Sequence, residues 1–346
     1  MQLGPIESVI LFGGGAPLIA CLQFLRDRSV PTTIFTSERQ INDRLHGSEI
    51  AFAEALDNLG ATYYMSEDIG TEERLAQHLG PTTLGLSLDS AWIFDREFID
   101  RFNGRLLNSH GARLPHFRGG GGFTWPMLRK TQLGYSLVHF ITPGIDDGSI
   151  LSSREYQFPD SCRFPEDRFV YASEQDAEFL CDVLEGALTN RSWNPPSQPD
   201  YLSTYSPRLH TPIHGVVDWS WSSEEIVNFV TAFDRPYPGA STFYSGGRVI
   251  LRSAVLTPED GRFHPFQAGL VFRKISGLLS IAARPHAIGF EQILDEDGND
   301  LMPRLRLGDR LHTPTSQLDE ARTFRATYTA RGLRTATSIG PSSTAG

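Results

Sequence analysis

Cysteine is scarce in this chain of 346 residues, which contains only three. Cys21, Cys162 and Cys181 are far apart and odd in number, and no Cys-x-x-Cys pair occurs. A disulfide framework usually needs an even set of cysteines, and a zinc site needs closely spaced ligands. We therefore expect neither, and the composition indicates a protein of the reducing cytoplasm.

Long apolar runs are also missing. No stretch approaches the roughly 20 residues that a membrane-spanning helix needs. Residues 1–22 have no basic segment, and Gly13–Gly15 and Pro17 interrupt their apolar part, so we expect no signal peptide. With 40% hydrophobic and 21% charged residues, the chain has an ordinary globular composition and is long enough for two domains.

Positive charge is in deficit. The chain has 31 Lys and Arg against 41 Asp and Glu, which gives a formal net charge of −10. Such a balance is a poor electrostatic match to nucleic acid and to an anionic membrane surface. We therefore expect neither of these partners.

Strand and helix patterns alternate along the N-terminal half. Apolar segments predict strands at residues 8–12, 30–36, 83–88 and 106–110, and helical spacing falls at 17–26, 49–59 and 96–102. This alternation predicts an α/β fold with a Rossmann-like, mostly parallel sheet that helices cover on both faces. Gly13–Gly15 lacks the full Gly-x-Gly-x-x-Gly pattern, so we interpret it as a tight strand-to-helix turn and not as a dinucleotide site.

Most of the recognisable chemistry lies between residues 106 and 150. Asn108 and His110 are two residues apart in a predicted strand and therefore share one face. Asp146 follows in a Gly-Ile-Asp-Asp-Gly turn after the next strand. An amide donor for an oxyanion, an imidazole base, and a carboxylate that holds the base and raises its pKa suit the transfer of a small acyl group to an amine.

This region resembles the 10-formyltetrahydrofolate-dependent formyltransferases. Three pieces match that family in order: Asn-x-His at residues 108–110, Leu-Pro-x-x-Arg-Gly at 114–119 and Asp-x-Gly-x-Ile at 146–150. The resemblance implies that Asn108, His110 and Asp146 are catalytic. It also implies that 10-formyltetrahydrofolate is the formyl donor and that no metal takes part.

The resemblance further implies a pterin site and a substrate loop. The pterin site would include Asp146 together with Ser87, Leu88, Trp92, Ile93, Thr142 and Pro143. Trp92 could equally belong to the core. The loop Arg118, Gly119, Gly120 and Gly121 would bind the substrate, but family members usually have larger residues after Arg-Gly. Either the loop backbone approaches a ligand closely, or it is a flexible turn.

The C-terminal part of the chain also resembles this family. Asp218-Trp219-Ser220 and Pro238-Gly239-Ala240 resemble motifs of the family's C-terminal domain, an OB-like β-barrel. Ser222 can cap a helix that ends near residue 233, and Gly246-Gly247 can turn a hairpin. We expect domains at residues 1–190 and 213–314, a linker at 191–212 and a weakly ordered polar tail at 315–346.

The resemblance leaves two amine substrates open, a nucleotide-linked amino sugar and methionyl-tRNA. The family's tRNA enzymes carry a basic insertion after the second strand, but the matching residues 36–60 have two arginines against five acidic residues. Residues 211–312 have ten basic and twelve acidic residues. A tRNA contact surface should be basic, so we favour the small nucleotide-linked amine.

Two further points stay open on sequence alone. A non-catalytic protein that binds folate or a nucleotide is a second alternative, although the complete set of Asn108, His110 and Asp146 argues against it. The resemblance is also compatible with a homodimer.

Overall fold

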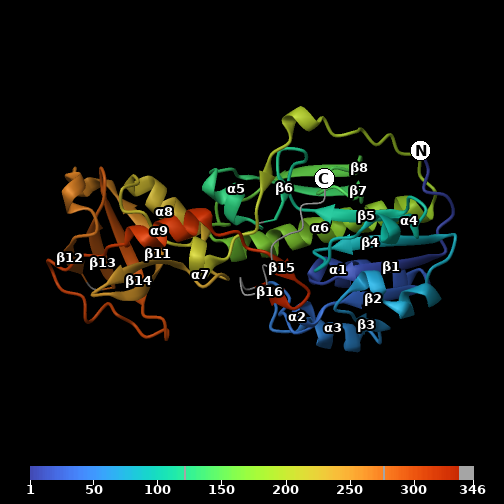
Figure 1. The fold of residues 1–346 in the computed structure, drawn as a ribbon, viewed down its shortest axis with the longest axis horizontal. Helices are drawn as coiled ribbons and strands as arrows, with labels where there is room; N and C mark the ends of the chain where they lie inside the picture. Colours follow the sequence, from blue (N-terminus) through green and yellow to red (C-terminus); the bar gives the residue numbers. More distant parts are fainter. Residues whose placement is uncertain (121, 276, 335–346) are drawn as a thin grey trace, which may run out of the picture.

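The computed structural model describes residues 1–120, 122–275 and 277–334. Two domains lie side by side and are joined by a linker (Figure 1). The N-terminal domain is an α/β structure that contains all the predicted catalytic residues. The C-terminal domain is built on a smaller β-sheet.

A seven-stranded sheet forms the centre of the N-terminal domain, in the order β3-β2-β1-β4-β5-β7-β8. Its strands are β1 (Ser8–Gly13), β2 (Thr32–Thr36), β3 (Tyr63–Met65), β4 (Thr83–Leu88), β5 (Leu106–His110), β7 (Leu133–Phe140) and β8 (Ile150–Gln157). The first five strands in this order pair in parallel, whereas β7 pairs antiparallel with both β5 and β8. The prediction of a mostly parallel sheet is confirmed.

Alternating residues of β1 supply the cores on both faces of the sheet. Val9 and Leu11 pack with apolar residues of α1 (Ala16–Asp27), α3 (Phe52–Asn58) and α6 (Pro165–Leu188). Ile10 and Phe12 face the other way and pack with phenylalanines of and around α4 (Arg96–Asp100). The shorter helices of this domain are α2 (Glu38–Ile41), α5 (Thr124–Leu128), η1 (Ile69–Thr71) and η2 (Glu73–Gln77).

The turn after β1 is as tight as its glycines suggest. Gly13 has φ 114°, and a Cβ there would lie 1.9 Å from the carbonyl oxygen of Leu88. Only glycine can therefore occupy this position beside β4. The geometry agrees with a strand-to-helix turn.

The C-terminal domain has a five-stranded antiparallel sheet in the order β10-β11-β14-β13-β12. Its strands are β10 (Ala240–Tyr244), β11 (Gly247–Thr257), β12 (Val271–Ile275), β13 (Leu278–Ala282) and β14 (Ala287–Leu294), with short helices η4 (Pro258–Asp260) and η5 (Pro265–Gln267). Helix α8 (Ser223–Ala232) packs on this sheet, and the Ser222 side chain accepts a hydrogen bond from the Glu225 N–H at its start. The predicted helix cap and the β10–β11 hairpin are both confirmed.

The linker lies against the N-terminal domain. Its strand β9 (Tyr205–Ser206) pairs in parallel with β6 (Arg118–Gly119) in the glycine-rich loop. The linker also contains η3 (Asp200–Leu202) and leads into α7 (Thr211–His214). The linker and the loop after β5 therefore form one packed unit.

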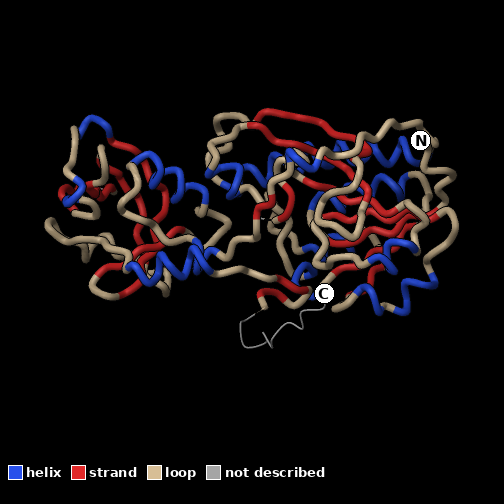
Figure 2. The backbone as a smooth tube through the Cα atoms, turned by 45° about the horizontal axis from the view of Figure 1, so that its top comes forward, coloured by secondary structure: helices blue, strands red, loops and turns tan. Residues whose placement is uncertain are grey.

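The segment after residue 314 corrects our expectation of a weakly ordered tail. Residues 315–323 form α9 (Thr315–Thr323), which packs against α7. The chain then returns toward the N-terminal domain and makes a small hairpin of β15 (Tyr328–Thr329) and β16 (Gly332–Leu333) (Figures 1 and 2). Composition suggested disorder because this segment is polar, but tertiary contacts order it. Residues 335–346 lie outside the described part.

Candidate functional site

The end of β5 brings the predicted catalytic residues to one place. In the sheet register, Asn108 lies between Ser87 of β4 and His139 of β7. His110 ends the strand, and its ring lies next to the carboxylate of Asp146. The buried Leu106 and Leu107 at the start of β5 fix the strand in the core, which holds the polar end in position.

His110 is held by the backbone of the following loop. Its Nε2 donates a hydrogen bond to the carbonyl oxygen of Phe117, at 2.8 Å. A carbonyl oxygen only accepts, so Nε2 carries the proton and Nδ1 has the free lone pair. Burial lowers the pKa of His110, and the charge of Asp146 opposes this only in part. The ring is therefore neutral at neutral pH, with Nδ1 ready to take a proton.

Asp146 lies at the centre of the cluster. Its backbone has φ 50°, a left-handed conformation that Asp adopts more easily than most residues. Oδ2 accepts the Gly119 N–H at 2.8 Å and is 3.9 Å from His110 Nδ1, while Oδ1 is 3.5 Å from His139 Nε2. Burial raises the pKa of Asp146, but the contact with His139, the nearby His110 and the Gly119 N–H outweigh it and lower the pKa to about 2. The carboxylate is ionised.

This geometry corrects the role expected of Asp146 toward the imidazole. At 3.9 Å from Nδ1, Asp146 is too far away to hold His110 by a hydrogen bond, and Phe117 holds the ring instead. Asp146 does favour the charged imidazolium. Burial has the larger effect, however, so the pKa of His110 is lowered and not raised.

His139 is a member of the cluster that sequence reasoning missed. Its ring is buried, and Nδ1 donates to the carbonyl oxygen of Phe140 at 2.8 Å. Nε2 lies 3.2 Å from Asn108 Nδ2 and 3.5 Å from Asp146 Oδ1, so an unprotonated Nε2 accepts from the Asn108 amide whereas a protonated one donates to the Asp146 carboxylate. In the unprotonated form the contact orients the Asn108 amide and leaves its second N–H for a ligand. The sequence carries no signal for this role, because cross-strand pairing cannot be seen from one strand alone.

The glycine-rich loop is closely covered by protein. Gly119, Gly120 and Gly122 have no room for a side chain, because the linker and the C-terminal domain lie against them. The nearest atoms to a Cβ would be the Ser206 carbonyl oxygen at 2.5 Å, Arg208 Cγ at 2.1 Å and the Tyr237 hydroxyl at 2.9 Å, respectively. Packing within the protein thus explains the departure from the family pattern at these three positions. Gly121 lies outside the described residues.

Arg118 is occupied by contacts with the linker. Its guanidinium donates to Gln198 Oε1 at 3.1 and 3.2 Å and to Asp200 Oδ1 at 3.2 Å. Gln198 in turn donates to the carbonyl oxygens of Asp146 and Gly148, at 2.8 and 2.7 Å. Arg118 therefore helps to position the Asp146 turn through Gln198, and its role as a substrate ligand stays a prediction. Gln198 lies in the linker outside any motif, so the sequence carries no signal for its contacts.

The residues predicted to contact the pterin have mixed surroundings. Ser87 and Leu88 are buried at the end of β4. Trp92 packs against the phenylalanine core and donates through Nε1 to the Glu67 carbonyl oxygen at 3.2 Å, whereas Ile93 is 80% exposed. After β7, the Thr142 hydroxyl donates to Asp147, and Pro143 follows in the same loop. Their shared role in one folate site stays a prediction.

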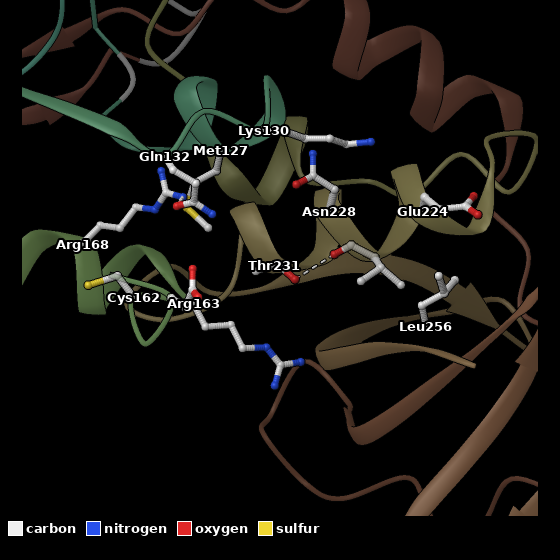
Figure 3. Close-up of a pocket in the computed structure, with 12 residues that line it drawn as sticks. Met127, Lys130, Gln132, Cys162, Arg163, Arg168, Glu224, Asn228, Thr231 and Leu256 are labelled. Carbon is white, nitrogen blue, oxygen red and sulfur yellow. Dashed lines mark hydrogen bonds between the residues drawn. The ribbon is translucent and has the colours of Figure 1, made fainter. Parts of the chain in front are cut away.

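A cavity of about 440 Å³ opens between the two domains, separate from this cluster. Its walls come from the α5 region, the start of α6, α8 and β11, and none of the predicted catalytic residues lines it (Figure 3). Arg168 at its edge donates to Thr131 and Gln132. The cavity is therefore distinct from the cluster around Asp146.

Metal-binding and membrane-spanning features concern the described ranges, which omit residues 121, 276 and 335–346. Within them no group of three or more His, Cys, Asp or Glu side chains is arranged to hold a metal ion. No helix there combines the length and apolar character needed to cross a membrane. Cys21, Cys162 and Cys181 are free thiols.

Comparison with known proteins identifies relatives for both domains. Residues 211–304 match the model for the formyl transferase C-terminal domain. A methionyl-tRNA formyltransferase from Acidobacterium capsulatum is 29% identical over 211 residues, which are 58% of this chain and 66% of that protein. The matched region thus spans slightly less than two thirds of that relative.

Solved structures share the fold at low sequence identity. WlaRD, a sugar 3N-formyl transferase crystallised with dTDP and 5-N-formyl-THF, has a TM-score of 0.61 and 16% identity and covers 83% of this chain and 97% of its own. The N-formyltransferase from Helicobacter canadensis, in complex with folinic acid and dTDP-3-aminofucose, has a TM-score of 0.61 and 15% identity, with coverages of 82% and 98%. These likenesses establish the fold across both domains.

Proposed function

We propose that this chain is an N-formyltransferase, which moves the formyl group of 10-formyltetrahydrofolate to a primary amine, as its similarity to the formyl transferase C-terminal domain and to methionyl-tRNA formyltransferases supports. The observation that carries this proposal is the cluster at the end of β5. It places the Asn108 amide, the unprotonated Nδ1 of His110 and the ionised Asp146 around one point. These groups supply an oxyanion donor, a base and a charge that stabilises the protonated base.

The proposed reaction begins with attack of the neutral amine on the formyl carbon. A carbon–nitrogen bond forms, and the carbonyl electrons move to the oxygen, which accepts a hydrogen bond from the free Asn108 N–H. One such donor is commonly worth about 3 kcal/mol in the transition state. His110 Nδ1 takes the proton of the attacking amine, and Asp146 stabilises the imidazolium from 3.9 Å away. The bond to the folate nitrogen then breaks, and the imidazolium returns its proton to that nitrogen.

We further propose that the amine belongs to a nucleotide-linked amino sugar. The acidic balance of residues 36–60 and 211–312 supports this choice over tRNA. The fold shared with two sugar-modifying enzymes, each crystallised with dTDP or a dTDP-linked amino sugar, supports it as well. The free cysteines agree with a cytoplasmic location, which forms part of the proposal.

Methionyl-tRNA is the second candidate substrate. It is favoured by the relatives found through sequence, among which methionyl-tRNA formyltransferases recur at 24–31% identity. The two candidates differ in charge. A tRNA ligand would make binding fall steeply with ionic strength through counterion release, whereas a nucleotide sugar carries few phosphates and should show a shallow dependence.

A substrate screen with the full chain tests this proposal. The donor 10-formyltetrahydrofolate is incubated with a panel of TDP-, UDP- and GDP-linked amino sugars and, separately, with charged initiator tRNA, and mass spectrometry detects the formylated product. We expect donor consumption and product with at least one nucleotide-linked amine. Formylation of tRNA with a steep salt dependence would identify methionyl-tRNA, and not a nucleotide-linked amino sugar, as the substrate. Donor binding without turnover on any amine would indicate a non-catalytic binding protein.

A further inference from the structure

An arginine without an acceptor lies in the N-terminal domain. Arg39, on the short helix α2, is half-buried, and its Nε is fully buried without a hydrogen-bond partner. Within residues 1–120, 122–275 and 277–334 Arg39 has no hydrogen bond or ion pair, and Asp43, whose pKa burial raises against the charge of Arg39, is an acidic group near it. A buried donor left without an acceptor is costly, so an acceptor from a ligand would stabilise Arg39.

A second arginine reaches the same region from the linker. The Arg208 stem lies on Gly120, one residue from the Gly119 N–H that holds Asp146. Its guanidinium is partly exposed, and in the described ranges its one ionic partner is Asp89 at 3.9 Å, which is itself largely exposed. Such a long, solvated ion pair contributes little, so the guanidinium is available to a stronger acceptor.

The C-terminal hairpin links the two arginines. Arg208 lies over the Tyr328 ring, 5.7 Å from its centroid. Asp89 also connects the two elements that carry these arginines, because its carbonyl oxygen accepts a hydrogen bond from Gln40 Nε2, next to Arg39, and its carboxylate is the one near Arg208. Burial raises the pKa of the Tyr328 hydroxyl, and the charges of Arg208 and Arg39 both oppose that shift. The hydroxyl is held near His210 Nδ1 at 3.2 Å and the Leu209 carbonyl oxygen at 3.4 Å.

The hairpin is itself fastened to the N-terminal domain. Arg331 forms an ion pair and hydrogen bond with Glu67, whose carbonyl oxygen also accepts from Trp92 Nε1. A segment from the far end of the chain is therefore attached to the N-terminal domain, beside which Figure 1 shows it. It also lies beyond residue 304, where the match to the C-terminal domain family ends.

We propose that Arg39, Arg208 and the Tyr328 hydroxyl form a binding site for the phosphate groups of the amine substrate, and that the C-terminal hairpin completes it. This inference rests on the proposed function, since it assigns the anionic part of a nucleotide-linked amine to a place beside the catalytic cluster. Two guanidinium groups from separate elements suit a diphosphate, which offers oxygens on several sides. Arg208 packs on Gly120, and the neighbouring Gly119 donates its N–H to Asp146. A ligand whose diphosphate binds Arg208 would therefore have its amine near Asp146.

Binding of a nucleoside diphosphate measured by calorimetry tests the site without requiring turnover. The variants are Arg39→Gln, Arg208→Gln and Tyr328→Phe in the full chain. Each arginine variant should weaken TDP, UDP or GDP binding by about tenfold or more, the usual loss for a charge-assisted hydrogen bond, and Tyr328→Phe by a few-fold. Arg44→Gln is the matched control, because Arg44 is in the same chain segment but 70% exposed and paired with Glu49.

Steady-state kinetics then separate the two anions that the site could hold. The folate donor carries glutamate carboxylates, so the Michaelis constants for donor and amine are measured in each variant. We expect a higher constant for the nucleotide-linked amine, with the donor constant and kcat little changed. A rise in the donor constant instead would place the folate carboxylates here and overturn the assignment.

The two proposals can fail independently. Nucleoside diphosphate binding that is unchanged in folded Arg39→Gln and Arg208→Gln proteins, while the wild type formylates a nucleotide-linked amine, would contradict this site and leave the activity standing. Binding that depends on both arginines in a protein without transferase activity would support the site and contradict the proposed reaction. Circular dichroism of each variant checks that it is folded.

Discussion

Two clusters of charged side chains lie near each other in this protein, and they differ in how far their hydrogen bonds are satisfied. Around Asp146 the described contacts form a closed set, in which Gly119, Phe117 and Phe140 hold the carboxylate and the two imidazoles. Around Arg39 and Arg208 the part of the chain that the structure describes offers fewer acceptors: Arg39 Nε has none, and Arg208 has Asp89 at 3.9 Å. The first cluster is organised before a ligand binds, as electrostatic catalysis requires, whereas the second is complete only with an anion.

The largest effect is expected at the organised cluster. His110→Ala should lower kcat by about two orders of magnitude or more, because it removes the base that takes the amine proton. Steady-state kinetics with saturating donor and amine measure this loss, and His264→Ala, an exposed histidine of the C-terminal domain, is the control. Near wild-type turnover in folded His110→Ala would show that His110 is not the base.

Asp146→Asn should slow the reaction and also change its pH dependence. Activity rises with pH as His110 loses its proton, and Asp146 is the group that holds this pKa up against burial. Without its charge the pKa of His110 falls further, so the acidic limb of the kcat/KM profile should move to lower pH. An acidic limb of the kcat/KM profile at the same pH in both proteins would show that Asp146 does not affect the pKa of His110.

The Asp146 carboxylate also makes the free energy of unfolding depend on pH. The pKa of Asp146 falls from its ordinary 3.8 to about 2 on folding, so the ionised form stabilises the native state. This contribution is present above about pH 4 and is lost as the pH falls toward 2; it amounts to about 2 kcal/mol. Urea unfolding at pH 7 and at pH 3 should therefore show a smaller acid-induced loss in Asp146→Asn than in the wild type.

His139 should contribute less than His110, because it acts through Asn108. Replacement by Phe removes the acceptor that orients the Asn108 amide and should lower kcat by about tenfold with little change in the Michaelis constants. His139→Gln retains an acceptor oxygen and should recover part of the rate. Equal losses in the two variants would indicate that packing, and not the hydrogen bond, is what matters.

The smallest effect is expected for the stability of an Arg39 variant, in the cluster of Arg39 and Arg208. Arg39→Leu should leave the ligand-free protein as stable as the wild type or about 1 kcal/mol more stable, because it removes an unsatisfied buried donor. Thermal unfolding measures this, and a nucleoside diphosphate should stabilise the wild type more than the variant. A clear loss of stability in ligand-free Arg39→Leu would mean that Arg39 has a structural role instead.

The residues of the Asp146 cluster differ in whether the sequence alone predicts them. Asn108, His110 and Asp146 could be found because strand periodicity and three ordered motifs fix them locally. Their partner His139 could not, since it faces Asn108 only through the antiparallel pairing of β5 and β7. The mostly parallel sheet and the β10–β11 hairpin followed from alternation and turn residues, whereas the strand order is known only from the structure.

Long-range packing accounts for what the sequence did not reveal. Helix α6 begins at Pro165, and tertiary contacts bury Pro165, Arg168 and Ala172 in its first turns. The segment at 315–334 is polar, and its order depends on α7 and the N-terminal domain. Arg208 gains its role only because the linker strand β9 pairs with the glycine-rich loop.

The central claim is formyl transfer at the Asp146 cluster, and following an isotopic label tests it most directly. A donor labelled in its formyl carbon is mixed with a nucleotide-linked amino sugar and either wild-type protein or Asn108→Ala, and mass spectrometry follows the label on the amine while donor binding is measured in parallel. We expect the wild type to transfer the label and Asn108→Ala to bind the donor with transfer reduced about a hundredfold. Equal transfer by both proteins, or donor binding by the wild type with no labelled product from any amine, would contradict the account.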